Sequence, residues 1–218
     1  MAIVAFPPIE EADEHGLLAV GGDLEMESLL LAYTQGIFPW PISEEYPLAW
    51  FSPDPRGILA FDKLHLSKSF RKFLKKNPYE IRFNTNFEAV IMNCSRVKRN
   101  DQSSTWITQE IIDAYIELFK HGFAYSCETY LDDRLVGGVY GVCINRFYSG
   151  ESMFHLEDNA SKVALVSLMY MLKQRDILWL DTQMVTPVVQ SLGGVEIPRE
   201  TYIKMLKVAL GLPDSSAD

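Results

Sequence analysis

The hydrophobic pattern changes at Gly122 from a helical period to strict alternation, and this change restricts the fold more than any other feature. From Thr108, a good N-cap, apolar residues recur at helical spacing until Gly122. Three alternating segments follow, over residues 123–130, 134–144 and 147–154, separated by short polar turns. They predict three consecutive strands in an antiparallel meander.

Further helical and extended segments surround this meander. Helices are predicted over residues 160–173 and 200–210, and a buried strand over residues 177–183. The order of helix, three strands, helix, strand and helix is typical of the α+β class. We therefore predict a mostly antiparallel sheet with helices packed on it.

Residues 1–65 have a different composition, because proline, glycine and aromatic residues are concentrated there. Asp23 is predicted to cap a short helix that ends near Gly36, and the rest is expected to form short elements joined by turns. The sequence thus predicts an N-terminal domain over residues 1–65. A second domain is predicted over residues 66–218, and it includes a basic helix over residues 67–77.

The composition excludes several classes of protein. The 218 residues, 48% of them apolar, suffice for a sizeable core, and no run approaches the ~20 apolar residues of a membrane span. The three cysteines form no CxxC pair, and the four histidines have no metal-binding spacing. We expect a cytoplasmic protein with reduced thiols, without a membrane segment, a metal or another cofactor. The N-terminus lacks the pattern of a secretory leader.

The predicted helix over residues 67–77 carries a strongly basic face. Its cations follow the i, i+3, i+4, i+7 spacing, with one more adjacent: Lys68, Arg71, Lys72, Lys75 and Lys76. Such a run is most often a solvated surface. In a chain of net charge −9, however, this concentration is what a local phosphate-binding patch needs.

Three polar residues on predicted strands are candidate site residues. Glu151 interrupts an apolar strand; it indicates either a sheet edge or a turn, or, in a central strand, a carboxylate that needs a cationic partner. Asp181 and Gln183 end the strand over residues 177–183, and their spacing places both on one face. They are either ordinary strand-end residues or a polar pair at the mouth of a cleft in which the carboxylate fixes the amide.

The aromatic residues also allow two interpretations. They are core residues, or they are platforms on which nucleotide bases stack. The sequence does not divide them between these roles: Tyr33, Phe38, Trp40, Trp50, Phe51 and Trp106.

Eight ordered segments together resemble the bacterial leucyl/phenylalanyl-tRNA–protein transferase family over nearly the whole chain. The matching segments cover residues 16–24, 36–40, 50–56, 105–108, 135–142, 150–154, 159–162 and 196–199. The resemblance implies a small N-terminal domain followed by a domain of the GNAT-like acyltransferase fold. It implies transfer of Leu or Phe, and less well Met, from aminoacyl-tRNA to proteins with an N-terminal Lys or Arg, which creates a destabilising N-terminus for protein degradation.

The resemblance also implies roles for individual residues. Asp181 and Gln183 match the catalytic Asp-x-Gln of the family, and Glu151 matches its active-site glutamate. The basic helix matches its tRNA-binding cluster. The residues that match substrate-binding positions are the aromatics Tyr33, Trp40 and Trp106 and the apolar pocket residues Val139, Tyr148, Met153, Leu165, Leu168 and Leu180.

Chemical considerations suggest different roles for Asp181 and Gln183. An amide is a poor base, so the Gln183 carbonyl is expected to accept a hydrogen bond from the attacking amine, with Asp181 orienting that amide. Glu151 is expected to hold the site or the cationic acceptor. No covalent enzyme intermediate is required, because the aminoacyl ester is already activated.

The chain departs from the family pattern at several positions. The departing residues are Thr182 between Asp181 and Gln183, Val188 where His is usual, Gly194 where Ala is usual, Tyr125, Tyr130, and His155 after the GESMF segment. These changes bear on acceptor preference and rate.

Two alternatives remain open at this stage. One is a CoA-dependent N-acetyltransferase of the same fold, although residues 155–159 offer two acids and no glycine where a pyrophosphate loop is needed. The other is an inactive module that binds tRNA or protein N-termini. Retention of Asp181, Gln183 and Glu151 favours an enzyme.

Overall fold

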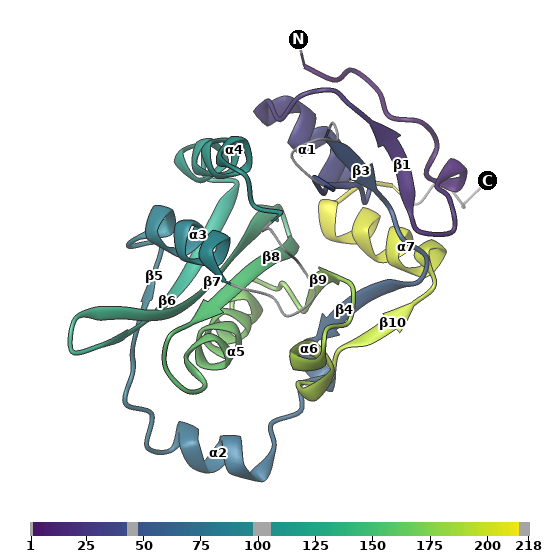
Figure 1. Ribbon diagram of the computed structural model, residues 1–218. Coiled ribbons are helices and arrows are strands. Elements are labelled where there is room, and N and C mark those ends of the chain that lie inside the picture. Colours follow the sequence, from purple (N-terminus) through teal and green to yellow (C-terminus); the bar gives the residue numbers. More distant parts are fainter. Residues whose placement is uncertain (1, 43–47, 98–105, 214–218) are drawn as a thin grey trace.

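The computed structural model describes residues 2–42, 48–97 and 106–213. They form a three-stranded and a seven-stranded sheet (Figure 1). The smaller sheet has the strand order β1-β3-β2, and the larger one has the order β10-β4-β9-β8-β7-β6-β5. The small-sheet strands are β1 (Leu17–Val20), β2 (Phe38–Pro39) and β3 (Ala49–Phe51). The large-sheet strands are β4 (Arg56–Ala60), β5 (Glu80–Phe83), β6 (Ala124–Leu131), β7 (Arg134–Ile144), β8 (Phe147–His155), β9 (Trp179–Gln183) and β10 (Val195–Ile197).

The predicted meander is confirmed. Strands β6, β7 and β8 pair antiparallel in sequence order, and the left-handed backbone of Asp132, Asp133 and Asn145 forms the tight turns between them. Every other pairing in the larger sheet is also antiparallel except that of β8 with β9. The α+β class with a mostly antiparallel sheet, predicted from the sequence, is therefore confirmed.

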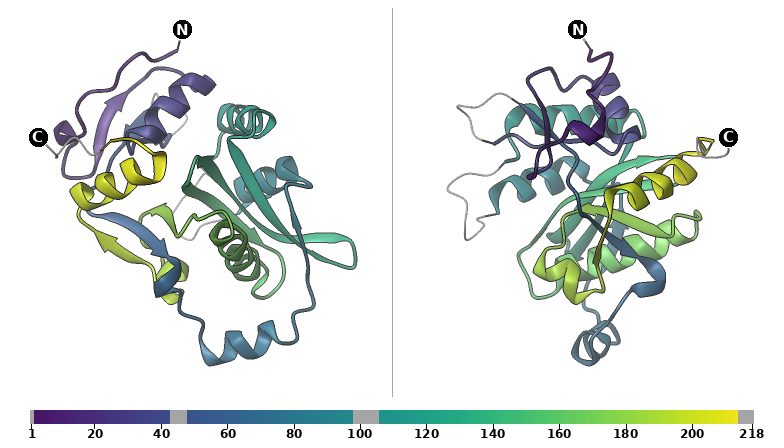
Figure 2. Two further views of the ribbon diagram at one scale, coloured as in Figure 1. Left: turned by 180° about the vertical axis from the view of Figure 1, so that it is seen from behind. Right: turned by 90° about the vertical axis from the view of Figure 1, so that its right-hand side faces the viewer.

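Helices cover both faces of the larger sheet (Figure 2). On one face lie α3 (Phe87–Arg96) and α4 (Gln109–Lys120), and on the other lies α5 (Ala160–Lys173). Alternation along β7 sends Tyr140 into the first core cluster and Val139 into the second. The predicted Thr108 cap is confirmed, since its side chain accepts a hydrogen bond from Ile111 N–H.

The N-terminal part packs against the end of the chain. Helix α1 (Met26–Thr34) and helix α7 (Arg199–Leu210) share a core with the first face of the larger sheet. The predicted cap by Asp23 is wrong: its carboxylate accepts hydrogen bonds from Glu25 N–H and Ser28 Oγ, and the helix begins after Glu25. Strand β4 comes from the first 65 residues but belongs to the larger sheet, and the two-domain division stays a prediction.

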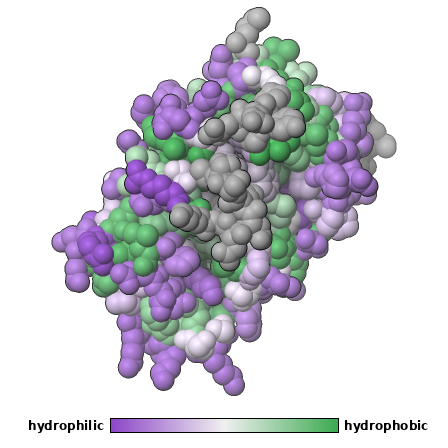
Figure 3. Space-filling model, in the orientation of Figure 1, coloured by the Kyte–Doolittle hydropathy of each residue, from purple (hydrophilic) through white to green (hydrophobic). Residues whose placement is uncertain are grey.

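Helix α2 (Lys68–Leu74) lies at the edge of the molecule in all three ribbon views, and its Phe70, Phe73 and Leu74 pack in or against the second core cluster. Ser67 caps it, as predicted, by accepting a hydrogen bond from Phe70 N–H. Hydrophilic side chains project from the edge of the molecule where α2 lies (Figure 3).

Several short elements were not predicted from the sequence, and neither was the ten-residue helix α3, which Asn86 caps. The remaining short elements are η1 (Ile9–Glu11), η2 (Phe61–Lys63) and α6 (Pro187–Ser191). No helix in the described parts of the chain has the length and apolar character needed to cross a membrane.

Candidate active site

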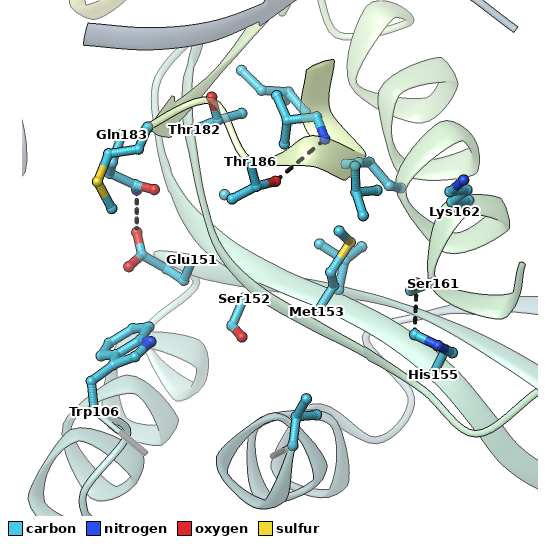
Figure 4. A pocket seen from close by; sticks show the side chains of 18 of the residues that line it. Trp106, Glu151, Ser152, Met153, His155, Ser161, Lys162, Thr182, Gln183 and Thr186 are labelled. Carbon is cyan, nitrogen blue, oxygen red and sulfur yellow. Dashed lines mark hydrogen bonds between the residues drawn. The ribbon is translucent and has the colours of Figure 1, made fainter. Parts of the chain in front are cut away.

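A cavity of about 540 Å³ opens where strands β8 and β9 separate. These two parallel strands pair only at Ser149 and Asp181. Beyond this pair the strands diverge, and side chains from β2, β7, α5 and the segment after β9 close the space between them. Glu151 and Gln183 face each other on one side of the cavity, with Trp106 beside them, whereas His155 and Ser161 lie on the other side (Figure 4).

A β-bulge in each of the two strands changes the direction of the side chains at the candidate residues. Tyr140 pairs with Ser152 and Gly141 pairs with Gly150, so Glu151 is the extra residue on β8. On β9, pairing steps from Asp181 to Gln183, which leaves Thr182 as the extra residue. Bulges of this kind are common beside active sites, because they turn side chains out of the regular alternation.

A glycine opposes each bulge because there is no room for a side chain. A Cβ on Gly141 would lie 2.1 Å from the carbonyl oxygen of Ser149, and a Cβ on Gly57 would lie 2.6 Å from the main chain of Met184. Both neighbours are main-chain atoms that cannot move aside cheaply. The two glycines thus allow the backbone approach on which both bulges depend.

The Glu151 carboxylate is held by neutral hydrogen-bond donors. Ser149 Oγ donates to Oε1 at 2.9 Å, and Tyr115 O–H donates to Oε2 at 3.3 Å. Tyr115 is in turn hydrogen-bonded to the hydroxyl of Tyr33. Loss of water around the carboxyl raises the pKa of Glu151 to about 7, against the hydrogen bonds that favour its ionised form. At neutral pH the group can therefore both take up and release a proton.

Glu151 lies in a central strand of the sheet but lacks the cationic partner predicted for that case. Among the described residues no ion pair to its carboxylate is found; Ser149, Tyr115 and Gln183 bind it instead. The bulge turns the side chain toward the cavity, and the raised pKa reduces the charge that has to be compensated.

Gln183 is fixed at both its main chain and its side chain. Its side-chain Nε2 donates to Ser149 Oγ at 2.7 Å and to Glu151 Oε1 at 3.4 Å. Its main chain has φ 55°, a left-handed conformation that costs roughly 1–2 kcal/mol for a residue with a side chain. Because both amide hydrogens point toward acceptors on β8, the carbonyl oxygen is the atom left to interact with a bound group.

Asp181 is fully buried and does not line the cavity. Its carboxylate forms a two-point ion pair with Arg56, at 2.9 and 2.6 Å, and accepts a hydrogen bond from Tyr202 O–H at 2.9 Å. Asp181 Oδ1 also accepts a hydrogen bond from the main-chain N–H of Gln183, at 2.9 Å. Asp181 was expected to orient the Gln183 amide, but it does not contact that amide: it holds the main chain of Gln183, and Ser149 and Glu151 hold the amide.

The remaining lining combines apolar and aromatic side chains with several polar ones, which are Ser152, His155, Asn159, Ser161, Lys162, Thr182 and Thr186. We call Val139, Met153, Leu165 and Leu180 the apolar floor, and all four were predicted pocket residues. Phe38, Trp40 and Trp106 form an aromatic wall, in which the two tryptophan rings are 6.1 Å apart. Thr105, which precedes Trp106 in the matching segment, lies outside the described residues.

Three predicted substrate-binding residues do not line the cavity. Tyr33, Tyr148 and Leu168 are buried in the cores on either face of the sheet. Tyr33 contacts Tyr115, which in turn contacts Glu151, and the Tyr148 hydroxyl donates to the Tyr125 carbonyl. These side chains support the wall from behind.

The predicted tRNA-binding residues lie apart from the cavity on α2 and the two residues that follow it. All five cations of this basic face are exposed, and none forms an ion pair with a described residue: Lys68, Arg71, Lys72, Lys75 and Lys76. Their charge is therefore available to a polyanion.

Sequence reasoning missed Arg56, Ser149, Tyr115 and Tyr202, which hold the three catalytic candidates in place. Arg56 lay in a matching segment, and the glycines inside strand patterns could have indicated the bulges. The contacts themselves have no local signal. Of the departures from the family pattern, Thr182, Val188 and His155 all line the cavity.

The α+β fold, with a cavity that ends at a carboxyl and a carboxamide on adjacent strands, is compatible with an enzyme of the group-transfer type. Family models match residues 22–54, as the leucyl/phenylalanyl-tRNA protein transferase N-terminal domain, and residues 58–207, as leucyl/phenylalanyl-tRNA protein transferase. The chain belongs to this transferase family.

Similar proteins named leucyl/phenylalanyl-tRNA–protein transferase agree with this assignment. The one from Flavobacterium johnsoniae is 48% identical over 202 residues, 93% of this chain and 95% of its own. Those from Maridesulfovibrio salexigens and Pseudoalteromonas atlantica are each 47% identical over 95% of this chain, and over 87% and 89% of their own lengths.

Solved structures are less similar. A GCN5-related N-acetyltransferase-like protein from Streptococcus suis aligns at TM-score 0.36 and 11% identity, over 74% of this chain and 59% of that one. At this score the likeness carries no argument, and the fold class rests on the sheet itself.

Proposed function

We propose that this chain transfers leucine or phenylalanine, and less well methionine, from aminoacyl-tRNA to the N-terminal Lys or Arg of acceptor proteins. The product carries a destabilising N-terminus and is directed to degradation. The chain is a member of this transferase family. The observation that carries the proposal is that the apolar floor, Glu151 and Gln183 all line one cavity.

The apolar floor suits the donor side chain. Val139, Met153, Leu165 and Leu180 offer no hydrogen-bond partner to a polar side chain, so a leucyl or phenylalanyl group binds there with the lowest desolvation cost. Methionine at position 153 is flexible, which allows the floor to accept both branched and aromatic groups. The tryptophans of the aromatic wall suit the base of the terminal nucleotide, which stacks on them.

The polar side of the cavity suits the acceptor amine. The carbonyl oxygen of Gln183 accepts a hydrogen bond from the attacking nitrogen, and the Glu151 carboxylate attracts the cationic acceptor. Glu151, with a pKa of about 7, takes the proton that the ammonium loses, since the α-amino pKa is close to it at about 7.7–8.0.

The reaction balances without a cofactor. The amine nitrogen forms an amide bond with the ester carbonyl carbon, and the bond from that carbon to the ribose oxygen breaks. The leaving ribose oxygen receives the proton that Glu151 carries.

The phosphates of the tRNA bind to the basic face of α2 and so position the tRNA. These contacts do not depend on the nucleotide sequence. The three cysteines form no disulfide, which agrees with a reducing compartment, and we place the reaction in the cytoplasm.

The test is transfer of radiolabelled Phe or Leu from charged tRNA to a peptide with N-terminal Arg. Label should enter this peptide, and should not enter the same peptide with an acetylated N-terminus. A parallel incubation with acetyl-CoA tests the rival N-acetyltransferase. Acetylation of the peptide without any transfer from Phe-, Leu- or Met-tRNA would refute the proposal.

A further inference from the structure

Arg56 is the centre of a buried polar network behind the cavity wall. It is the first residue of β4 and is 1% exposed. Its guanidinium spans separate parts of the chain: Nε and Nη2 donate to Asp181, and Nη1 donates to the carbonyl of Gly36 at 2.9 Å. No donor of this side chain reaches the cavity, so its influence on a substrate has to pass through these partners.

Each partner of Arg56 leads to a different wall of the cavity. Asp181 fixes the main-chain N–H of Gln183, whose left-handed backbone aims the carboxamide at Ser149 and Glu151. On the other side, Gly36 begins the segment that runs to the aromatic wall. The Arg56 guanidinium also stacks on Phe38 of that wall, 4.8 Å from the ring centre.

The shape of the guanidinium is essential to this arrangement. The planar group lies against two rings, since its Cζ is also 4.5 Å from the ring centre of Tyr202, while its edges donate to two acceptors at once. A lysine ammonium keeps the charge but cannot form the two-point contact to Asp181 and the contact to Gly36 together. Charge and geometry can therefore be separated by Arg56→Lys.

We infer that Arg56 is a positioning residue for the transfer reaction, which holds Gln183 through Asp181 and the aromatic wall through Gly36 and Phe38. The inference rests on the proposed function for its catalytic meaning. Its structural part does not depend on the reaction. Without the two-point contact from the Arg56 guanidinium, Asp181 no longer holds the main-chain N–H of Gln183 in place.

The first experiment measures that release directly, without a substrate. Hydrogen exchange of the Gln183 main-chain amide, followed by NMR, should accelerate at least tenfold in Arg56→Lys, while amides at the centre of β7 keep their wild-type rates. The matched control is Arg82→Lys, because Arg82 also forms a two-point contact to a carboxylate, that of Glu80, but lies on β5. Unchanged exchange at Gln183 in Arg56→Lys would overturn the inference.

The second experiment is a double-mutant cycle on single-turnover transfer. Arg56→Lys should slow the chemical step at least tenfold in the wild-type background and less than twofold in a Gln183→Ala background, because its effect on that step passes through Gln183. It should also weaken binding of the charged tRNA through the aromatic wall. An equal loss in both backgrounds would show a general effect on folding and overturn the positioning role.

Two further comparisons keep the result decisive. If Arg56→Lys does not fold, Tyr202→Phe removes one donor to Asp181 and should shift the same two measurements in the same direction by a smaller factor. If the wild-type chain transfers nothing, the proposed function fails, whereas the exchange measurement still decides whether Arg56 fixes Gln183.

Discussion

The buried network around Arg56 and the basic face of α2 both concentrate charge, and they do so in opposite ways. Arg56 and Asp181 are 1% and 0% exposed and satisfy each other through a fixed geometry. The five cations of the basic face, on α2 and the two residues after it, are exposed and form no ion pair with a described residue. In the network each contact is specific and loss of one partner leaves a buried charge, whereas on the helix each cation adds to a common field.

Replacement of Asp181 by Ala should give the largest effect in this comparison. It leaves the Arg56 guanidinium buried without its counter-ion, which typically costs about 3–5 kcal/mol. Urea unfolding measures this loss, and Lys72→Ala on the basic face serves as the exposed control, with a change within about 0.5 kcal/mol. Equal changes in the two variants would remove the distinction between the regions.

Gln183→Ala should affect chemistry more than stability. The carbonyl that receives the attacking amine is lost, and the rate of the chemical step should fall by about 100-fold, or ~2.7 kcal/mol. The affinity for charged tRNA should stay nearly constant, because the basic face is intact. Single-turnover transfer with binding measured separately checks both points, and a wild-type rate would exclude this role of Gln183.

Glu151→Gln should raise stability in a pH-dependent way. The folded-state pKa of about 7 exceeds the ordinary value of 4.5, so the stability linked to this carboxyl is present below about pH 4.5 and is lost as the pH rises through 7. The neutral variant escapes that loss. Its unfolding free energy should exceed that of the wild type by ~1–3 kcal/mol at pH 8 and by less at pH 5. A difference that is the same at both pH values would contradict the raised pKa.

The double charge reversal Lys72→Glu and Lys75→Glu should have the smallest effect on the fold, with stability within ~0.5 kcal/mol of the wild type. Its effect should be on binding: the affinities for Leu-tRNA and Phe-tRNA fall together, and the slope of log affinity against log salt becomes about 2 units shallower. Lys120→Glu on α4, an exposed helical control, should leave binding unchanged. Unaltered tRNA affinity at low salt in the double variant would refute the patch.

The sequence predicted what depends on local spacing. The period of two over β6, β7 and β8 and the cap of α2 by Ser67 are properties of neighbouring residues, and the structure confirms both. The basic face of α2 was equally visible, because i, i+3 and i+4 positions share a helical surface. Four of the residues predicted for the apolar pocket also line the cavity, although the resemblance, and not the periodicity, supplied them.

What the sequence did not reveal depends on contacts between distant segments. Arg56 lies 125 residues from Asp181 and 146 from Tyr202, so no spacing rule connects them. The bulge at Thr182 and the left-handed backbone of Gln183 break the two-residue alternation on which the predicted pairing of their side chains depended. For this reason the sequence correctly identified Asp181 and Gln183 as polar neighbours. It did not predict that Asp181 binds the main-chain N–H of Gln183 and not its side-chain amide.

The position of Tyr202 late in the chain has a consequence for biosynthesis. The described residues that line the cavity all precede position 190, so a growing polypeptide contains them before α7 has been synthesised. Until Tyr202 emerges from the ribosome, Asp181 lacks one donor and the Arg56 guanidinium lacks one of the two rings that it contacts. A product of premature termination that ends before α7 therefore carries these lining residues but lacks the Tyr202 hydroxyl that binds Asp181 and the Tyr202 ring beside Arg56. Translation of the first turn of α7 supplies these contacts.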